Sequence, residues 1–364
     1  MHKENFVVRA IDVGYGHIKF TDGRDQVSGQ IRTDVIPSQS PAVAVEATAA
    51  AERGNKEKPI TVLSKRDTFI VPVNGTLYEV GRDIHMATHG NHESEVMDSR
   101  FATTDVYAAR LYGALNYMLP TLPGREIDIL VLGLPMTTFS AYRSELEARF
   151  TGTHVINEGR TTVSINCCVI YPQPLGSYAA YLEEVLGSAP TPMALVVDPG
   201  YNTVDWFVCK GMVANELRSS AVQRGVGQML RPVAIDIIKR LKIDATPAEL
   251  VRLVDRCLVT GQKLELYSDT YDVADFLDAG KGVVTEAAQA IKNNVGSGAD
   301  INVIVVTGGG AALYAPAITD QFPSHKVVAL PSPATANVRG FHELGERMAR
   351  SRMRAMQARD VVEA

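Results

Sequence analysis

The chain has 364 residues, of which 46% are hydrophobic and 21% charged, and its formal net charge is −5 at pH 7. No run approaches the ~18 apolar residues of a membrane span, and an acidic chain lacks the basic face that coats nucleic acid. We therefore expect neither a membrane protein nor direct nucleic-acid binding. The four cysteines form no CxxC pair and the start carries no signal-peptide pattern, so a cytoplasmic location is expected.

The first predicted element is a hairpin near the start of the chain. Residues 6–11 (FVVRAI) predict an apolar strand that stops at Asp12, turns through glycine and returns as a second strand. Glycine lets the backbone approach an anion closely, and a turn of unpaired N–H groups can hold phosphate. Because Asp12 would repel a bare phosphate, we expect Mg²⁺ between the two.

Residues 34–95 are expected to form a subdomain inserted at the surface, which we call the first excursion. It contains a strand turn at Asn74-Gly75. It also places His85, His89 and His92 at a spacing that could bind a metal on one helix face, but glycine interrupts that helix and a polar loop is the favoured reading.

An amphipathic helix is predicted over residues 101–119, where Pro120 ends it, and a buried strand over residues 127–135. A strand ending at Tyr171 and a helix over residues 177–186 follow, with Gln173 at their junction.

The stretch from Ala194 to Trp206 repeats the first hairpin. Aligned without a gap, it shares the aspartate, glycine and tyrosine of the first copy, so Asp198 lies over Asp12. One such hairpin is weak evidence of a site. Two matching copies could hold a polyphosphate from both sides, with a divalent cation beside Asp12 and Asp198.

The second half continues the repetition. An excursion over residues 236–277, a helix over 283–295 and a strand from Ile301 lead to the glycine turn at 308–310. Bare backbone there can lie against a ribose or a flat ring, whereas alone the turn would be read as a tight strand-to-helix connection. The two phosphate hairpins favour the nucleotide interpretation.

The last predicted element is a helix over residues 340–360. The simpler interpretation docks it on the first domain, and the alternative makes it a filament or adaptor contact.

The whole pattern of hairpin, excursion, helix, strand and glycine turn thus occurs twice, which indicates an internal duplication. Alternating strands and helices predict an α/β fold of two domains around a nucleotide cleft. We place domain I at 1–165, with its insertion at 34–95 and completion by a C-terminal helix at 335–364. Domain II covers 166–334, with an insertion at 236–277.

These motifs resemble the actin, Hsp70 and sugar-kinase superfamily with its ribonuclease H-like fold, and within it the bacterial plasmid-segregation proteins of the ParM/StbA type. The resemblance implies ATP or ADP, Mg²⁺ held through water by Asp12 and Asp198, and a Gln173 that positions the attacking water. Asp12, Asp198 and Gln173 would be the catalytic residues, and Lys19 would reach the phosphates. The implied nucleotide-binding residues are Gly14, Tyr15, Gly16, His17, Lys19, Gly200, Tyr201, Asn202, Thr203, Gly225, Gly227, Gly308, Gly309, Gly310 and Ala311.

The resemblance also implies a function. The first expectation is an ATPase that polymerises into filaments and segregates plasmid DNA, with a DNA-binding adaptor protein at the plasmid centromere as its partner. The alternatives are a small-molecule kinase, which would need a further catalytic carboxylate, and a chaperone-type ATPase, which would need a β-rich segment after the nucleotide domain. One departure concerns Tyr15 and Tyr201, which stand where many relatives have small residues and could either narrow the phosphate site or pack outward.

Overall fold

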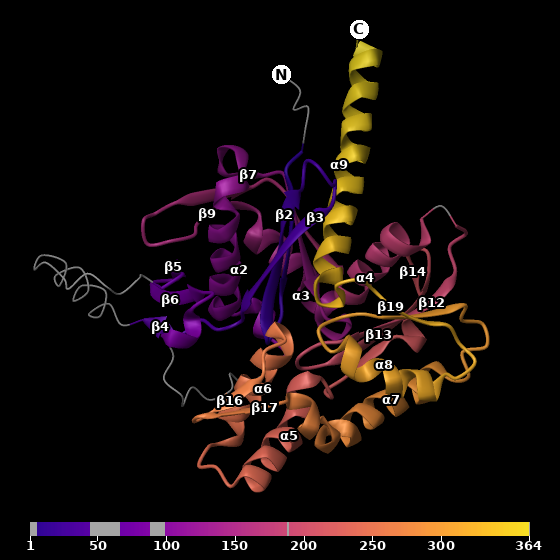
Figure 1. Cartoon of the computed structure of the whole chain (residues 1–364). Coiled ribbons are helices and arrows are strands. Elements are labelled where there is room, and N and C mark those ends of the chain that lie inside the picture. The colour runs from indigo at the N-terminus through magenta and orange to yellow at the C-terminus, as the bar shows by residue number, and fades with distance from the viewer. Residues whose placement is uncertain (1–5, 44–65, 88–98, 188, 364) are drawn as a thin grey trace, which may run out of the picture.

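The computed structural model describes residues 6–43, 66–87, 99–187 and 189–363. Within these ranges the chain forms two lobes, each built around its own β-sheet, and a long C-terminal helix projects from the body (Figure 1). We call the part around the five-stranded sheet lobe I and the part around the six-stranded sheet lobe II. No helix in the described ranges is both long and apolar enough to cross a membrane.

The sheet of lobe I has the strand order β11-β8-β1-β2-β3. Strands β11, β8 and β1 run parallel, whereas β1, β2 and β3 are antiparallel. The bounds are β1 (Val8–Val13), β2 (His17–Arg24), β3 (Ile31–Pro37), β8 (Ile129–Leu134) and β11 (Cys168–Pro172), with helices α2 (Asp105–Met118) and α3 (Met136–Phe150) and a small sheet of β7 (Glu126–Ile127), β9 (Gly152–Val155) and β10 (Thr162–Ile165).

The sheet of lobe II repeats this arrangement, with the order β14-β13-β12-β18-β19 and β15 beside β13. Its β12–β13 hairpin is antiparallel and its β12, β18 and β19 are parallel, as in lobe I, so the predicted duplication is confirmed. The bounds are β12 (Met193–Pro199), β13 (Val204–Lys210), β14 (Val213–Ala214), β15 (Ser220–Val222), β18 (Val303–Val306) and β19 (Val327–Ala329), with helices α5 (Val226–Leu241), α7 (Lys281–Val295) and α8 (Ala311–Gln321).

Each lobe also carries the smaller elements expected of its excursion. In lobe I a three-stranded sheet contains the turn at Asn74-Gly75, between β5 and β6. In lobe II helix α6 precedes a two-stranded hairpin. The bounds are β4 (Ala42–Val43), β5 (Thr68–Val73) and β6 (Thr76–Gly81) in lobe I, and α6 (Pro247–Thr260), β16 (Leu264–Leu266), β17 (Asp269–Tyr271) and the 3₁₀ segment η7 (Val273–Gly280) in lobe II.

Three predicted boundaries differ from the structure. Strand β11 pairs with β8 in lobe I, so the change of sheet falls after Pro172 and not at residue 165. The first excursion begins after Pro37 and not at residue 34, because β3 pairs with β2 up to that residue. The second begins after Leu241, since α5 continues past residue 236. In the two excursions, the strand or helix continues through residues that local sequence patterns assign to a loop, whereas the strand before Pro172 is predicted but its sheet partner is not evident from the sequence.

Three hydrophobic cores follow from the alternation of side chains along the central strands. In β1, Ile11 points into the core of lobe I, whereas Val8 and Ala10 point into a core shared by the two sheets. In β12, Leu195 and Val197 point into the core of lobe II and their neighbours into the shared one. The two sheets therefore pack on a common layer, which contains helices α4 (Gln173–Tyr181) and α9 (Ala336–Glu363).

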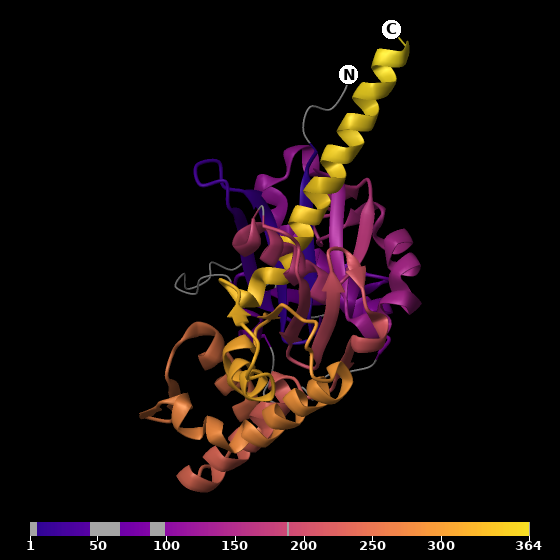
Figure 2. The ribbon, with the colours of Figure 1, turned by 90° about the vertical axis from the view of Figure 1, so that its right-hand side faces the viewer.

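Helix α9 packs on α4 and on strands β1 and β8 of the sheet of lobe I. Phe341 and Leu344 are buried in the shared core, whereas most side chains of residues 350–358 are exposed. Figures 1 and 2 show this last part extending well beyond both lobes.

Candidate functional site: a cleft between two hairpins

The two predicted hairpins form, and their tips face one cavity. In the first hairpin, Asp12 pairs with Lys19 across β1 and β2. In the second, Asp198 pairs with Asp205 across β12 and β13. The buried apolar strands place all four side chains at the same depth in their sheets, because the two hairpins have the same length and register.

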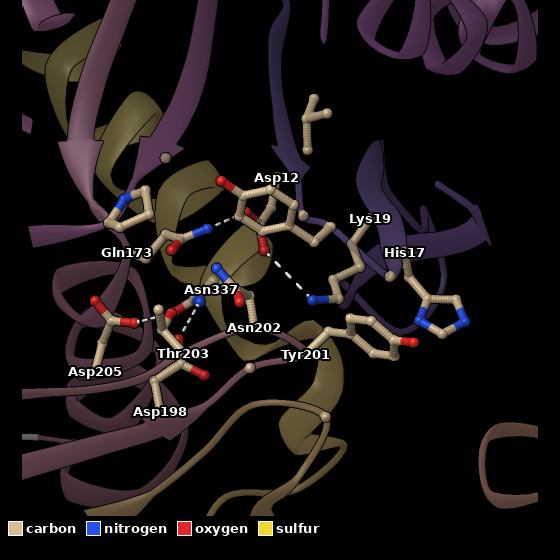
Figure 3. Close-up of a pocket in the computed structure, with 18 of the residues that line it drawn as sticks. Asp12, His17, Lys19, Gln173, Asp198, Tyr201, Asn202, Thr203, Asp205 and Asn337 are labelled. Carbon is tan, nitrogen blue, oxygen red and sulfur yellow. Dashed lines mark hydrogen bonds and ion pairs between the residues drawn. The ribbon is translucent and has the colours of Figure 1, made fainter. Parts of the chain in front are cut away.

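The cavity has a volume of about 390 Å³ and is lined from both lobes (Figure 3). This volume is in the range of small-molecule sites. The predicted residues that line it are Asp12, Gly14, Tyr15, Gly16, His17, Lys19, Gln173, Asp198, Gly200, Tyr201, Asn202, Thr203 and Gly309.

Asp12 is at the centre of the wall that lobe I contributes. It is almost fully buried, and its Oδ1 accepts a hydrogen bond of 2.7 Å from Nε2 of Gln173. Its Oδ2 lies 3.5 Å from Nζ of Lys19. Gln173 is the first residue of α4, directly after β11, so the strand-to-helix junction directs its amide into the cleft as the sequence predicts. Lys19 is half-buried and faces the cavity, which argues against the alternative of an exposed strand residue.

Asp198 is held from the other side by a buried polar network. Nδ2 of Asn337, in the first turn of α9, donates a 2.6 Å hydrogen bond to Oδ2 of Asp198. Oδ1 of Asn337 accepts from the backbone N–H and the hydroxyl of Ser177, and that hydroxyl lies 2.8 Å from Oγ1 of Thr307. Burial raises the pKa of Asp198, the bond from Asn337 and the charge of Lys19 lower it, and the nearby Asp12 raises it again.

A third carboxylate, Asp205, lies in the cleft, and the sequence analysis did not assign it a role. Its Oδ2 accepts a 2.6 Å hydrogen bond from Oγ1 of Thr203. Among the described residues Oδ1 has no partner of normal geometry, although the backbone of Met136, at the start of α3, is near enough to lower the pKa. Burial is the larger effect and raises the pKa of Asp205 to about 7. Asp205 is the last residue of the repeated motif and pairs with Asp198 across the hairpin. This position was the signal in the sequence that could have identified Asp205.

The two tyrosines at the hairpin tips behave differently. Tyr15 stacks on Phe101 of lobe I, with ring centroids 4.7 Å apart, and both residues line the cavity. Tyr201 lies between the hairpins, where its ring contacts Gly16 of lobe I and Gly227 of lobe II. Tyr15 is thus part of the cavity wall, with Phe101 beside it, and Tyr201 narrows the space between the two hairpins.

His17 and Asp255 face each other beside Tyr201. Nε2 of His17, from β2 of lobe I, lies 4.0 Å from Oδ2 of Asp255, on α6 of lobe II. Burial, helped by the charge of Lys19, lowers the pKa of His17 to about 4. Burial raises the pKa of Asp255 to about 6, against the opposing effect of Lys19. Both shifts favour the neutral forms of the two side chains.

Other glycines of the predicted site support the cleft from behind its wall. The amides of Gly225 and Gly227 donate to the carbonyls of Asn202 and Tyr201, which fixes the second hairpin on α5. Gly308 has φ +76°, and a side chain there would collide with Oδ1 of Asp198. The predicted residues placed behind the wall are Gly225, Gly227, Gly308, Gly310 and Ala311.

The chemistry of the cavity fits a nucleotide with a divalent cation. In the described part of the chain, the ionisable side chains lining it include Asp12, Asp198, Asp205 and Asp255 but a single lysine, Lys19. Such a site repels a bare polyphosphate. Asp12 and Asp198 are two buried carboxylates that line one cavity, and such a pair favours Mg²⁺, which prefers oxygen ligands. His89 and His92 of the alternative metal site lie outside the described residues, within which no cluster of three metal-binding side chains occurs.

Comparison with known proteins identifies the family. Residues 10–176 match the model for the N-terminal domain of actin-like proteins, and residues 196–320 match the model for the C-terminal domain of archaeal MreB-like actin homologues. No curated protein sequence matches the chain significantly.

Among solved structures, the archaeal actin homologue Ta0583 superimposes with a TM-score of 0.69 at 18% identity, covering 94% of this chain and 100% of its own. A ParM filament from Clostridium botulinum gives 0.67 at 19% identity, covering 94% and 99%. The apo ParM protein of pSK41 gives 0.64 at 18% identity, covering 96% and 99%. With the two family models spanning both lobes and their shared cleft, the chain belongs to the actin-like protein family.

Proposed function

We propose that this protein binds and hydrolyses ATP in the cleft between its lobes and that the nucleotide controls its polymerisation into filaments. The observation that carries the proposal is the pair of facing hairpins, whose buried aspartates, Asp12 and Asp198, converge on one cavity beside Lys19. A structure of Ta0583 in complex with ADP superimposes on this chain with a TM-score of 0.67, which supports a nucleotide in the same cleft.

In this proposal each group has a separate task. The backbone of the two hairpin tips binds the phosphates, and Lys19 neutralises part of their charge. Asp12 and Asp198 would hold Mg²⁺ through water, and the cation when bound offsets the charge that develops on the phosphate oxygens. Gln173 orients the attacking water through its Oε1, since its Nε2 is bonded to Asp12. Gly309 and its neighbours leave room for the nucleoside.

For the cellular role we propose the segregation of plasmid DNA, reached through a DNA-binding adaptor protein at the plasmid centromere. The net charge of −5 disfavours direct contact with DNA, so the adaptor would supply the basic surface. The similar structures include ParM filaments, which supports self-assembly. A cytoplasmic location accords with this role.

The test is a light-scattering and pelleting assay on the whole chain, with phosphate release measured on the same sample. ATP with Mg²⁺ should raise scattering above a critical protein concentration, and scattering should fall as ATP is consumed. Electron microscopy of the pellet should show filaments. ADP, or ATP with EDTA, serves as the control. A monomer at every concentration with ATP would refute polymerisation, and an absence of phosphate release would refute hydrolysis.

A second candidate, a small-molecule kinase, gains support from one observation. Such an enzyme needs a carboxylate to deprotonate the hydroxyl of its substrate, and Asp205 provides a third carboxylate in the cleft, with a pKa of about 7. The assay separates the two candidates. A kinase would consume ATP faster when a sugar or polyol is added and would yield a phosphorylated product, whereas a filament ATPase would respond to its own concentration.

A further inference from the structure

We propose that the side chain of Tyr201 is a clasp between the lobes that holds the cleft shut and limits the rate of nucleotide release. The inference rests on the proposed function only in assuming that the cleft binds a nucleotide. The clasp consists of Tyr201, the two glycines that contact its ring, Gly16 and Gly227, and the neighbouring pair of His17 and Asp255.

The backbone of Tyr201 is fixed on lobe II. Its carbonyl accepts a 2.8 Å hydrogen bond from the amide of Gly227, and the neighbouring carbonyl of Gly200 accepts one of 3.0 Å from the amide of Val226. Both donors belong to the first turn of α5. The second hairpin therefore moves as one unit with lobe II, and the tyrosine ring is the part of it that crosses the cleft.

The first hairpin is fixed on lobe I in the same way. The carbonyl of Gly16 accepts a 3.0 Å hydrogen bond from the amide of Ser38, and the carbonyl of Gly14 accepts a 2.5 Å bond from the hydroxyl of Ser38. Because both hairpins are tied to their own lobes, a contact between their tips is a contact between the lobes.

The ring of Tyr201 fits a slot that only glycine can form. A Cβ on Gly16 would lie 2.9 Å from Cδ2 of the ring, and a Cβ on Gly227 would lie 2.8 Å from Cε1. Both distances are shorter than normal carbon contacts. The ring is thus packed against backbone from each lobe, and the cleft cannot open without removing it from contact with Gly16.

The pair of His17 and Asp255 adds a second contact beside the ring. Their 4.0 Å separation is too long for a direct hydrogen bond, so it contributes less than the packing of the ring. Figure 3 shows Tyr201, His17 and Lys19 together at one side of the cavity, away from Gln173 and Asp205. The clasp therefore lies apart from Gln173, the residue proposed to position the attacking water.

Two variants test the clasp from opposite lobes. Tyr201→Ala removes the ring, and Gly16→Ala pushes it from the slot. With a fluorescent ATP analogue in stopped flow, each should release nucleotide about 10-fold faster or more, which corresponds to about 1.4 kcal/mol or more. Tyr201→Phe keeps the ring and should restore slow release. Tyr267→Ala, which truncates an exposed tyrosine of lobe II outside the cleft, is the matched control.

Hydrogen exchange of the nucleotide-free chain gives an independent readout. If the clasp holds the lobes together, Tyr201→Ala and Gly16→Ala should both speed exchange of the amides at the two hairpin tips, while amides in the cores of both sheets keep their protection. Unchanged exchange at the tips would overturn the clasp whether or not the protein binds nucleotide. A wild type that binds no analogue would contradict the proposed function instead, and the exchange result would still decide for or against the clasp. Release rates within twofold of wild type in both variants would also overturn it.

Discussion

Lys19 and Asp205 occupy the same position in the two hairpins and carry opposite charges. Each is the residue paired across its hairpin with the cleft aspartate, Asp12 in lobe I and Asp198 in lobe II. The duplicated fold thus presents a cation from one side and a carboxylate from the other. This difference makes the two halves of the cleft chemically unequal, so the two hairpins should respond differently to substitution.

Substitution of Asp12 or Asp198 tests whether the cleft binds Mg²⁺ together with the nucleotide. Asp12→Asn and Asp198→Asn keep the shape of the side chain but remove its charge. We expect affinity for Mg²⁺-ATP to fall by about 10- to 100-fold, as when groups that orient a metal are removed. Isothermal titration calorimetry with and without Mg²⁺ measures the effect. Equal affinity in wild type and both variants would refute the site.

Gln173→Ala separates binding from hydrolysis. The variant loses the group proposed to orient water, so phosphate release should slow by about 10- to 1000-fold. Binding of ATP should change little, because the hairpins and Lys19 are untouched, and filaments should persist longer than those of wild type. The measurement is phosphate release alongside light scattering.

The hydrogen bond from Gln173 to Asp12 calls for a control in that experiment. Gln173→Glu keeps the length of the side chain but places a second carboxylate beside Asp12, so it should weaken binding as well as hydrolysis. A wild-type rate in Gln173→Ala would show that another residue orients the water.

Asp205→Asn should make the nucleotide-free protein more stable at neutral and alkaline pH. Folding raises the pKa of Asp205 from 3.8 to about 7, so between these values the folded state binds more protons than the unfolded state, and stability falls as the pH rises. The variant keeps an acceptor for Thr203 but has no charge to bury. Its melting temperature should exceed that of wild type by more at pH 8 than at pH 5. An equal difference at both values would show that Asp205 titrates normally.

Asn337→Ala tests the network that holds Asp198. It removes the donor to Asp198 and the acceptor for Ser177, and both remaining groups are buried. We expect a loss of about 1–3 kcal/mol in the free energy of unfolding, measured by denaturant titration. Asn293→Ala, on the exposed face of α7, should change it by less than about 0.5 kcal/mol. Similar effects of the two substitutions would argue against the network.

The sequence predicts much of this fold because the two halves repeat. A strand that ends at Asp12 and another that ends at Asp198 can be recognised from local pattern alone, and matching strands later in each half complete the two sheets. The position of Gln173 follows from a strand and helix that are both evident in the sequence. Such features depend only on residues that are close together in the sequence, so one sequence is enough to recognise them.

The remainder of the site depends on packing between distant segments. Asn337 reaches Asp198 because α9 packs between the sheets, and Asp255 reaches His17 because α6 folds over the cleft. No local pattern at either residue indicates its partner. The different contacts of Tyr15 and Tyr201 have the same origin, since Tyr15 packs on Phe101 whereas Tyr201 packs on Gly16 and Gly227.

Helix α9 has a mechanical consequence. Its first turn is bonded to a carboxylate of lobe II, its middle is packed on the sheet of lobe I, and its end stands free of both. A helix of 28 residues is roughly 42 Å long. The part beyond the shared layer, residues 350–363, is roughly 21 Å long, so a rotation of about 5° would move its end by roughly 2 Å. A small rearrangement at the phosphates would then displace the free end of α9, and a molecule bound to that end could sense the movement.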